Sequence, residues 1–205
     1  MLNIHARAAF SRALAPMGAN LAKMGVTPNA ITIFGTVGAV AASVGFLANG
    51  WFFTATMVIW FFVMLDLVDG AVARAGGTGS LFGAVLDSSC DRIADAAVFA
   101  AIVWYYAKHG ERWMVLAALL CLILGSLTSY IRARAEAANL TATVGVAERA
   151  ERLIIVLVGT GLTGLGVPFV LAIALWLLVA ASTITVYQRF ATVHAQSKAL
   201  QSADK

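Results

Sequence analysis

The chain has 205 residues, of which 61% are hydrophobic and only 12% are charged. Soluble domains carry about 25% charged residues, so this composition excludes an ordinary soluble domain and indicates an integral membrane protein. The formal net charge of +4 does not indicate nucleic-acid binding. The basic residues stand at the ends of apolar runs, where they suit anionic lipids or an anionic substrate.

The first 25 residues lack the unbroken apolar stretch of a cleavable signal peptide. They place apolar residues such as Phe10 and Leu14 among Arg7, Arg12 and Lys23. This pattern predicts an interfacial amphipathic helix over residues 1–25, with a disordered start as the alternative. At the other end, residues 195–205 form a polar tail, and we expect its segment SKALQSADK, residues 197–205, to fray.

Between these ends the sequence contains six apolar runs, and a membrane span needs roughly 20 such residues. The sequence therefore predicts an all-α integral membrane protein with six transmembrane helices, folded as a single domain over residues 1–205. Cys90 and Cys121 fall in different runs, so we expect free thiols. The predicted spans are residues 31–48, 52–72, 84–107, 113–131, 153–165 and 167–186.

The basic residues also predict the orientation of the chain, because lysine and arginine concentrate in short cytoplasmic loops. With the N-terminus inside, only Lys108 and Arg112 of the 14 lysines and arginines fall on the outer side. We therefore expect a multi-pass protein of the plasma membrane with both termini in the cytoplasm.

Four aspartates flank a glycine-rich turn, GGTGS, between the second and third runs. Asp66 and Asp69 stand one helical turn apart, and Asp87 and Asp91 are spaced i and i+4. Because the turn reverses the chain, the two helices form an antiparallel hairpin that can bring the four carboxylates together at the cytoplasmic side.

Ionised carboxylates near a membrane cost several kcal/mol each unless a cation compensates them. Oxygen ligands without His or Cys suit hard cations such as Mg²⁺, Mn²⁺ or Ca²⁺, and paired metals serve displacement at phosphorus. Structural charges paired with arginines and a cation or proton transporter remain as alternatives. Gly70, Ala73 and Gly83 favour chemistry, because they leave space beside the carboxylates for a bulky group.

The pattern D-x-x-D-G-x-x-A-R-x8-G-x-x-x-D-x-x-x-D resembles the signature of the CDP-alcohol phosphotransferase family. Members of that family are six-helix membrane enzymes, commonly homodimers, that transfer a phosphatidyl-type group from a CDP-linked donor to an alcohol and release CMP. Its defined positions are Asp66, Asp69, Gly70, Ala73, Arg74, Gly83, Asp87 and Asp91.

The resemblance implies two divalent cations, Mg²⁺ with Mn²⁺ possible. Asp66 and Asp87 would bridge them, Asp69 would complete the first, and Asp91 would bind the second and act as the catalytic base. The implied CDP-lipid site adds Ser80, with Asn29 and Thr32 from the segment TPNAIT. Its full set is Asn29, Thr32, Gly70, Ala73, Arg74, Ser80 and Gly83.

Arginines near the later runs indicate the acceptor. Arg132, Arg134, Arg149 and Arg152 flank one short loop, and Arg189 ends the last run. Guanidinium groups match phosphate oxygens, so a phosphorylated acceptor is expected. The alternatives are helix-surface pairs, such as Arg132 with Glu136, and contacts with lipid headgroups.

The segments SYIRARAEA and ERAERLIIVL resemble the actinobacterial branch of the family that makes phosphatidylinositol phosphate. This resemblance implies transfer from CDP-diacylglycerol to myo-inositol phosphate. Glycerol phosphate as acceptor is the alternative within the family, and a divalent-cation transporter is the alternative from another class. The implied acceptor residues are Ser129, Arg132, Arg134, Arg149, Arg152 and Arg189.

Overall fold

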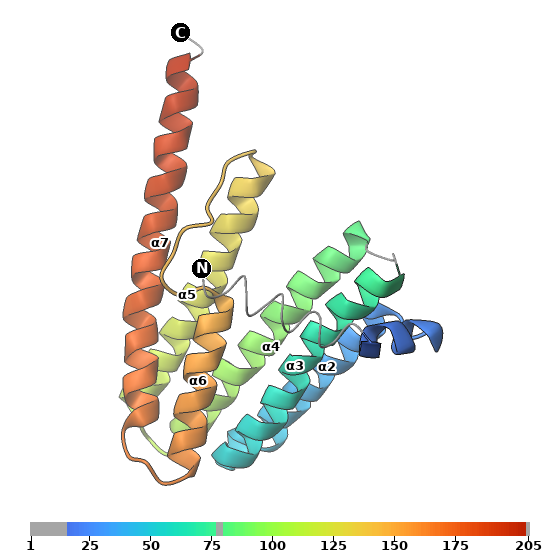
Figure 1. Ribbon diagram of the computed structural model, residues 1–205. Coiled ribbons are helices and arrows are strands. Elements are labelled where there is room, and N and C mark those ends of the chain that lie inside the picture. Colours follow the sequence, from blue (N-terminus) through green and yellow to red (C-terminus); the bar gives the residue numbers. More distant parts are fainter. Residues whose placement is uncertain (1–15, 77–79, 204–205) are drawn as a thin grey trace. The chain divides into compact units, whose positions relative to one another are not determined.

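The structure is a computed structural model that describes residues 16–76 and 80–203, and Figure 1 shows its ribbon. The described residues form helices joined by short connections, without a strand. This confirms the predicted all-helical class. The helices are α2 (Pro28–Gly45), η1 (Leu47–Asn49), α3 (Phe52–Gly76), α4 (Leu81–Lys108), α5 (Arg112–Ala137), α6 (Arg149–Gly164) and α7 (Val170–Ala203).

Each of the six predicted spans coincides with one helix from α2 to α7. Within the described residues, four segments are long and apolar enough to cross a membrane: Pro28–Asn49, Phe52–Arg74, Arg112–Ala137 and Val170–Ser202. Helix α4 carries several charged residues, and α6 has 16 residues, fewer than the roughly 20 that a span needs. Four helices that can cross a membrane agree with the expected membrane protein, and the count of six spans stays a prediction.

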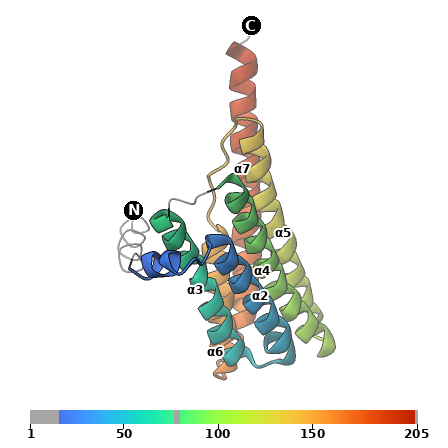
Figure 2. The ribbon, with the colours of Figure 1, turned by 90° about the vertical axis from the view of Figure 1, so that its right-hand side faces the viewer.

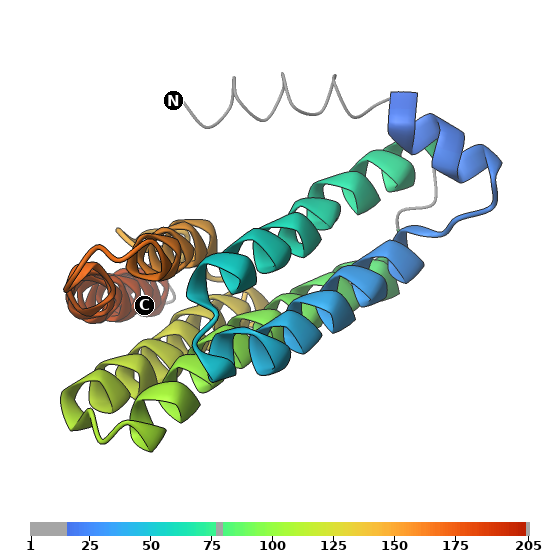
Figure 3. The ribbon, with the colours of Figure 1, turned by 90° about the horizontal axis from the view of Figure 1, so that it is seen from below.

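The chain divides into two compact units, and the first comprises residues 1–49 and 54–98. In this unit α2 and α3 lie side by side (Figure 3). Glycines allow their close approach, because a Cβ on Gly35 would stand 3.1 Å from the Phe62 carbonyl oxygen and one on Gly38 would overlap the Phe62 ring. A small apolar core of Ile31, Val68 and Val72 joins the two helices at the end that carries the aspartates.

The chain before α2 is helical at residues 16–23, and the first 15 residues of the predicted amphipathic segment lie outside the described part. Gly18 stands so close to α3 that a Cβ would lie 2.7 Å from the backbone of Ala71. Leu21 and Val26 pack on the core of Ile31, Val68 and Val72. This helix is thereby fixed against α3, and its place at a membrane interface stays a prediction.

The second unit comprises residues 50–53 and 99–205, in which α7 packs against both α5 and α6. Figure 2 shows that α7 continues past the end of α5. The expectation that residues 197–205 fray is wrong for the described residues, because α7 is helical to Ala203. Its extension is held by Gln196, which hydrogen-bonds to Thr141. Both cysteines are free thiols, as expected.

Candidate active site

An acidic cavity of about 230 Å³ lies in the first unit. Asp69 from α3 and Asp87 from α4 both line it, so the hairpin brings together aspartates from the two halves of the signature. All the residues expected at the CDP-lipid site except Arg74 also line it. They are Asn29, Thr32, Gly70, Ala73, Ser80 and Gly83.

Thr32 holds one of these aspartates. Its hydroxyl donates to Asp69 Oδ2 at 2.5 Å, and both residues are buried, with 7% and 8% of their surface exposed. The local sequence explains the position of Thr32: Thr27 caps the start of α2 by accepting from the Ala30 N–H, and Pro28 begins the helix. Thr32 follows one turn later and therefore faces α3.

Ser80 and Gly83 also line the cavity. The Ser80 hydroxyl accepts the Gly83 N–H at 2.9 Å, a capping bond at the start of α4. A Cβ on Gly83 would lie 3.1 Å from Ser80 Oγ and 3.2 Å from Asn29 Oδ1. Glycine at this position therefore leaves room for the oxygens of Asn29 and Ser80 at the cavity wall.

Arg74 lies near the end of α3, next to the cavity-lining residue Gly70. A Cβ on Gly70 would stand 3.3 Å from Arg74 Nη1, so the guanidinium folds back over Gly70 one turn earlier. Arg74 itself is exposed. A cation beside an acidic cavity suits an anionic ligand such as a diphosphate.

The other two aspartates of the signature, Asp66 and Asp91, each stand one helical turn from an aspartate that lines the cavity. Asp66 lies on α3 one turn before Asp69, and its side chain is outside the described set. Asp91 lies on α4 one turn after Asp87, and its Oδ2 is 3.7 Å from Arg92 Nη2. Among the described side chains, which omit Asp66, no group of three or more His, Cys, Asp or Glu is close enough to hold a metal ion.

The described part of the cavity nevertheless fits a hard divalent cation by its donor chemistry. Its polar side chains are the carboxylates of Asp69 and Asp87, the Asn29 amide and the hydroxyls of Thr32 and Ser80. These groups offer oxygen ligands without His or Cys, as Mg²⁺ and Mn²⁺ prefer. Binding by all four aspartates stays a prediction.

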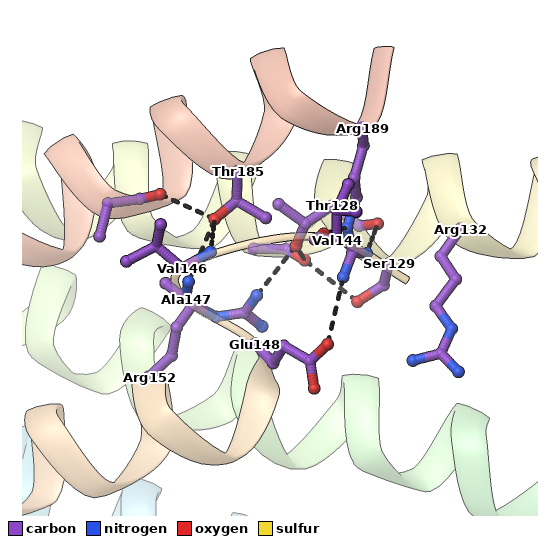
Figure 4. Close-up of polar contacts among 12 residues, drawn as sticks. Thr128, Ser129, Arg132, Val144, Val146, Ala147, Glu148, Arg152, Thr185 and Arg189 are labelled. Carbon is purple, nitrogen blue, oxygen red and sulfur yellow. Dashed lines mark hydrogen bonds and ion pairs between the residues drawn. The ribbon is translucent and has the colours of Figure 1, made fainter. Parts of the chain in front are cut away.

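Buried arginines meet in the second unit, and Figure 4 shows their contacts. Arg152 from α6 is 2% exposed, and its Nη1 donates to the Thr128 hydroxyl at 2.9 Å. Its guanidinium lies against α5 at Gly125, where a Cβ would stand 3.0 Å from Cζ. Ser129, which follows Thr128 on α5, donates its hydroxyl hydrogen to the Gly125 carbonyl.

Arg189 approaches Thr128 from α7 and is 4% exposed. Its Nη1 donates to the Thr128 carbonyl at 2.5 Å and its Nε donates to the Val144 carbonyl at 2.9 Å. Glu148 Oε1 lies 3.9 Å from Nη2, near enough to compensate part of the charge. Thr128 therefore connects two buried guanidiniums, one through its hydroxyl and one through its carbonyl (Figure 4).

The connection between α5 and α6, residues 138–148, is fastened to α7. The Thr185 hydroxyl accepts both the Val146 and Ala147 N–H groups at 3.1 Å. Gly145 has φ +151°, and a Cβ there would collide with the Thr185 side chain. These contacts fix the start of α6, from which Arg152 projects (Figure 4).

The structure separates the other expected acceptor residues. Arg132 is exposed, and its Nε donates to Glu136 at 2.9 Å, the surface pair weighed as an alternative. Arg134 is two residues further, about 200° around the helix, and it lines an apolar groove between α5 and α7. Arg149 is the first residue of α6. Ser129, Arg152 and Arg189 therefore gather around Thr128, and Arg134 does not join them.

Sequence reasoning missed Thr128, Thr185 and Gln196, and it considered Glu148 only as a partner of Arg152, whereas the structure places it near Arg189. Thr128 is separated from its arginine partners by 24 and 61 residues, and Thr185 from its two N–H partners by 38 and 39 residues. The spacing of residues within one helix gives no information about hydrogen bonds between residues so far apart in the sequence.

The fold and these two clusters define a helical membrane protein with an acidic, oxygen-lined cavity and a buried pair of arginines. Residues 25–187 match the family model described as CDP-alcohol phosphatidyltransferase. The chain belongs to this family, and it is therefore an enzyme of this class. The hypothesis of a cation transporter is set aside for this reason.

Relatives of known function agree with this assignment. Phosphatidylinositol phosphate synthase of Mycobacterium tuberculosis is 47% identical over 193 residues, which cover 91% of this chain and 88% of the relative. A crystal structure of the M. tuberculosis enzyme with CDP-DAG bound has a TM-score of 0.86 at 45% identity and covers 89% of this chain and 94% of that one. A second structure of it, in complex with manganese and citrate, has a TM-score of 0.85 at 45% identity and covers 88% of each chain.

Proposed function

We propose that this chain transfers the phosphatidyl group of CDP-diacylglycerol to myo-inositol phosphate, giving phosphatidylinositol phosphate and CMP. The observation that carries the proposal is the cavity in which Asp69 and Asp87 meet Asn29, Thr32 and Ser80. The chemistry is also supported by family membership and by a relative whose structure holds CDP-DAG.

In the proposed reaction a hydroxyl of inositol phosphate attacks the phosphorus that carries the diacylglycerol. A new P–O bond forms, the P–O bond to CMP breaks, and Asp91 accepts the proton of the attacking hydroxyl. The nucleotide would lie along Gly70, Ala73 and Gly83, where small side chains leave room. Arg74 would pair with the diphosphate at the mouth of the cavity.

A divalent cation is the proposed cofactor, supported by the oxygen ligands of the cavity and by the relative crystallised with manganese. Asp66, Asp69, Asp87 and Asp91 would hold two such ions, Mg²⁺ or Mn²⁺. When bound, they would supply positive charge that offsets the diphosphate and the leaving CMP. Thr32 would orient Asp69 toward this site through its hydrogen bond.

The acceptor phosphate would bind to Arg152 and Arg189, with Ser129 and Arg132 at the edge of the site. Both buried guanidiniums are oriented by Thr128, so little conformational entropy is lost when an anion binds. Arg149 stays a candidate at the start of α6. We also propose six spans, a single functional domain, a homodimer, and a plasma-membrane location with the active site and both termini in the cytoplasm.

The test is CMP release by the purified protein with CDP-diacylglycerol and Mg²⁺ or Mn²⁺, with inositol 1-phosphate, inositol, glycerol 3-phosphate and serine as parallel acceptors. Release with inositol phosphate alone is expected, and Asp91→Asn should abolish it. CMP release with glycerol 3-phosphate alone would be consistent with the proposed role of the aspartates, but it would show that the acceptor is not inositol phosphate. No release with any acceptor would overturn the proposed reaction.

A further inference from the structure

An apolar groove of about 250 Å³ runs between α5 and α7 in the second unit. Leu127, Ile131 and Ala135, spaced four residues apart on one face of α5, form its floor. Phe190 and Val193 of α7 face them from the other side. The groove shares no lining residue with the acidic cavity and none with the contacts around Thr128.

One charged residue lines this groove, Arg134. It is exposed, and it stands between Tyr130 and Ala138 on the row of α5 next to the floor. An arginine in such a place lays its methylene stem along apolar surface and holds the guanidinium at the edge. The groove thus presents an apolar floor beside a single cation.

The groove spans the end of the apolar run of α5, where we expect this helix to leave the membrane. The apolar run of this helix ends near Ile131, and Arg134 and Ala138 lie beyond it. From Leu127 to Arg134 the groove extends about 10 Å along α5 at 1.5 Å per residue. This length fits within the roughly 15 Å that one leaflet contributes to a hydrocarbon core of about 30 Å. The groove can therefore hold the part of an acyl chain nearest the headgroup, with the arginine toward its polar end.

We propose that the α5–α7 groove binds one acyl chain of an anionic phospholipid, whose phosphate pairs with Arg134. The chain would lie over Leu127, Ile131 and Ala135, and the guanidinium would bind the phosphate oxygens. Charge complementarity favours this occupant over a second copy of the protein. An apolar helix seated here would bury Arg134 beside aliphatic side chains without an anion.

The proposal is tested by native mass spectrometry of the full-length protein in detergent, titrated with dioleoylphosphatidylglycerol or dioleoylphosphatidylcholine. One bound phosphatidylglycerol is expected, with a Kd about fivefold lower than for phosphatidylcholine, the preference that about 1 kcal/mol per juxtamembrane arginine gives. Arg134→Gln should remove this preference. Arg112→Gln, which removes an equal charge at the other end of α5, should retain it.

A second variant tests the groove itself. Ala138→Phe adds an aromatic ring at an exposed position on the rim and should weaken binding of both lipids. The proposal would be overturned by an unchanged lipid preference in Arg134→Gln or by unchanged lipid binding in Ala138→Phe. It would also be overturned if Tyr130→Cys formed an intermolecular disulfide in membranes, because that would show that a second copy of the protein covers the groove. A raised acceptor KM in Arg134→Gln with lipid preference intact would instead assign Arg134 to the acceptor.

Discussion

The guanidinium of Arg152 lies directly against Gly125, close enough that a Cβ at position 125 would stand 3.0 Å from Arg152 Cζ and 3.2 Å from its Nε. A glycine on α5 thus provides the surface on which a buried arginine of α6 rests. Because Arg152 also donates to Thr128 at 2.9 Å, its position depends on both residues.

We predict that Gly125→Ala displaces Arg152 and weakens use of the phosphorylated acceptor. A loss of about 1.4 kcal/mol corresponds to a tenfold higher acceptor KM, whereas the KM for CDP-diacylglycerol should change little. Steady-state CMP release with each substrate varied in turn measures both. Gly45→Ala is the control, because a Cβ there meets nothing within 4 Å. An unchanged acceptor KM in Gly125→Ala would contradict the role assigned to Arg152.

Thr185 accepts two backbone N–H groups at once, and Thr185→Val keeps its shape while removing the acceptor. Leaving the buried Ala147 N–H unsatisfied costs about 1–3 kcal/mol, so the variant should unfold at a lower temperature and show a raised acceptor KM. Thr185→Ser should restore both the unfolding temperature and the acceptor KM, because serine retains the hydroxyl.

The matched control for this change is Thr183→Val. Thr183 is exposed on the same helix, and its hydroxyl donates to the Val179 carbonyl one turn back. Loss of this hydrogen bond should change the unfolding temperature and the acceptor KM little. If both valine variants lowered the unfolding temperature and raised the acceptor KM equally, Thr185 would stabilise α7 and not the start of α6.

Gln196 holds the α5–α6 connection through both ends of its amide. Its Oε1 accepts the Thr141 N–H at 2.9 Å and its Nε2 donates to the Thr141 carbonyl at 2.7 Å. Gln196→Glu retains an acceptor and loses the donor, so we predict faster amide hydrogen exchange at residues 140–147. Gln201→Glu, an exposed change later on α7, should leave exchange in that segment as it is. Unchanged exchange in Gln196→Glu would show that Thr185 and Arg189 suffice to hold the connection.

Helix positions and one acidic cluster were predictable because they depend on local periodicity. Apolar runs place α2 to α7, and the spacing of Asp69 and Asp87 around a reversing turn places both carboxylates at one cavity. The tail was not predictable, because its helix continues to Ala203 with the support of Thr141, a residue 55 positions away from Gln196.

The arginines also show that contacts between residues far apart in the sequence could not be predicted. From sequence, Arg132, Arg134 and Arg152 all stand beside one loop. Helical geometry alone separates Arg132 from Arg134 by about 200°, a sign that both could not serve one pocket. The burial of Arg152 and Arg189 could not be foreseen from the sequence. It depends on contacts that α6 and α7 make with Thr128 of α5, and on the contact of Arg189 with Val144 in the α5–α6 connection.

The hydrogen bond from Thr32 to Asp69 gives a test of the acidic cavity that leaves every aspartate in place. Thr32→Val removes the donor to Asp69 Oδ2. Loss of a partner that orients a metal ligand costs about 10–100-fold in metal affinity or activity, so the Mn²⁺ concentration for half-maximal CMP release should rise by about tenfold or more. Thr32→Ser should restore the wild-type value. The control is Thr36→Val, one turn along α2, whose hydroxyl donates to the Thr32 carbonyl. If Thr32→Val left the Mn²⁺ requirement unchanged and lowered only thermal stability, this hydrogen bond would be structural, and Asp69 would not depend on it to bind a cation.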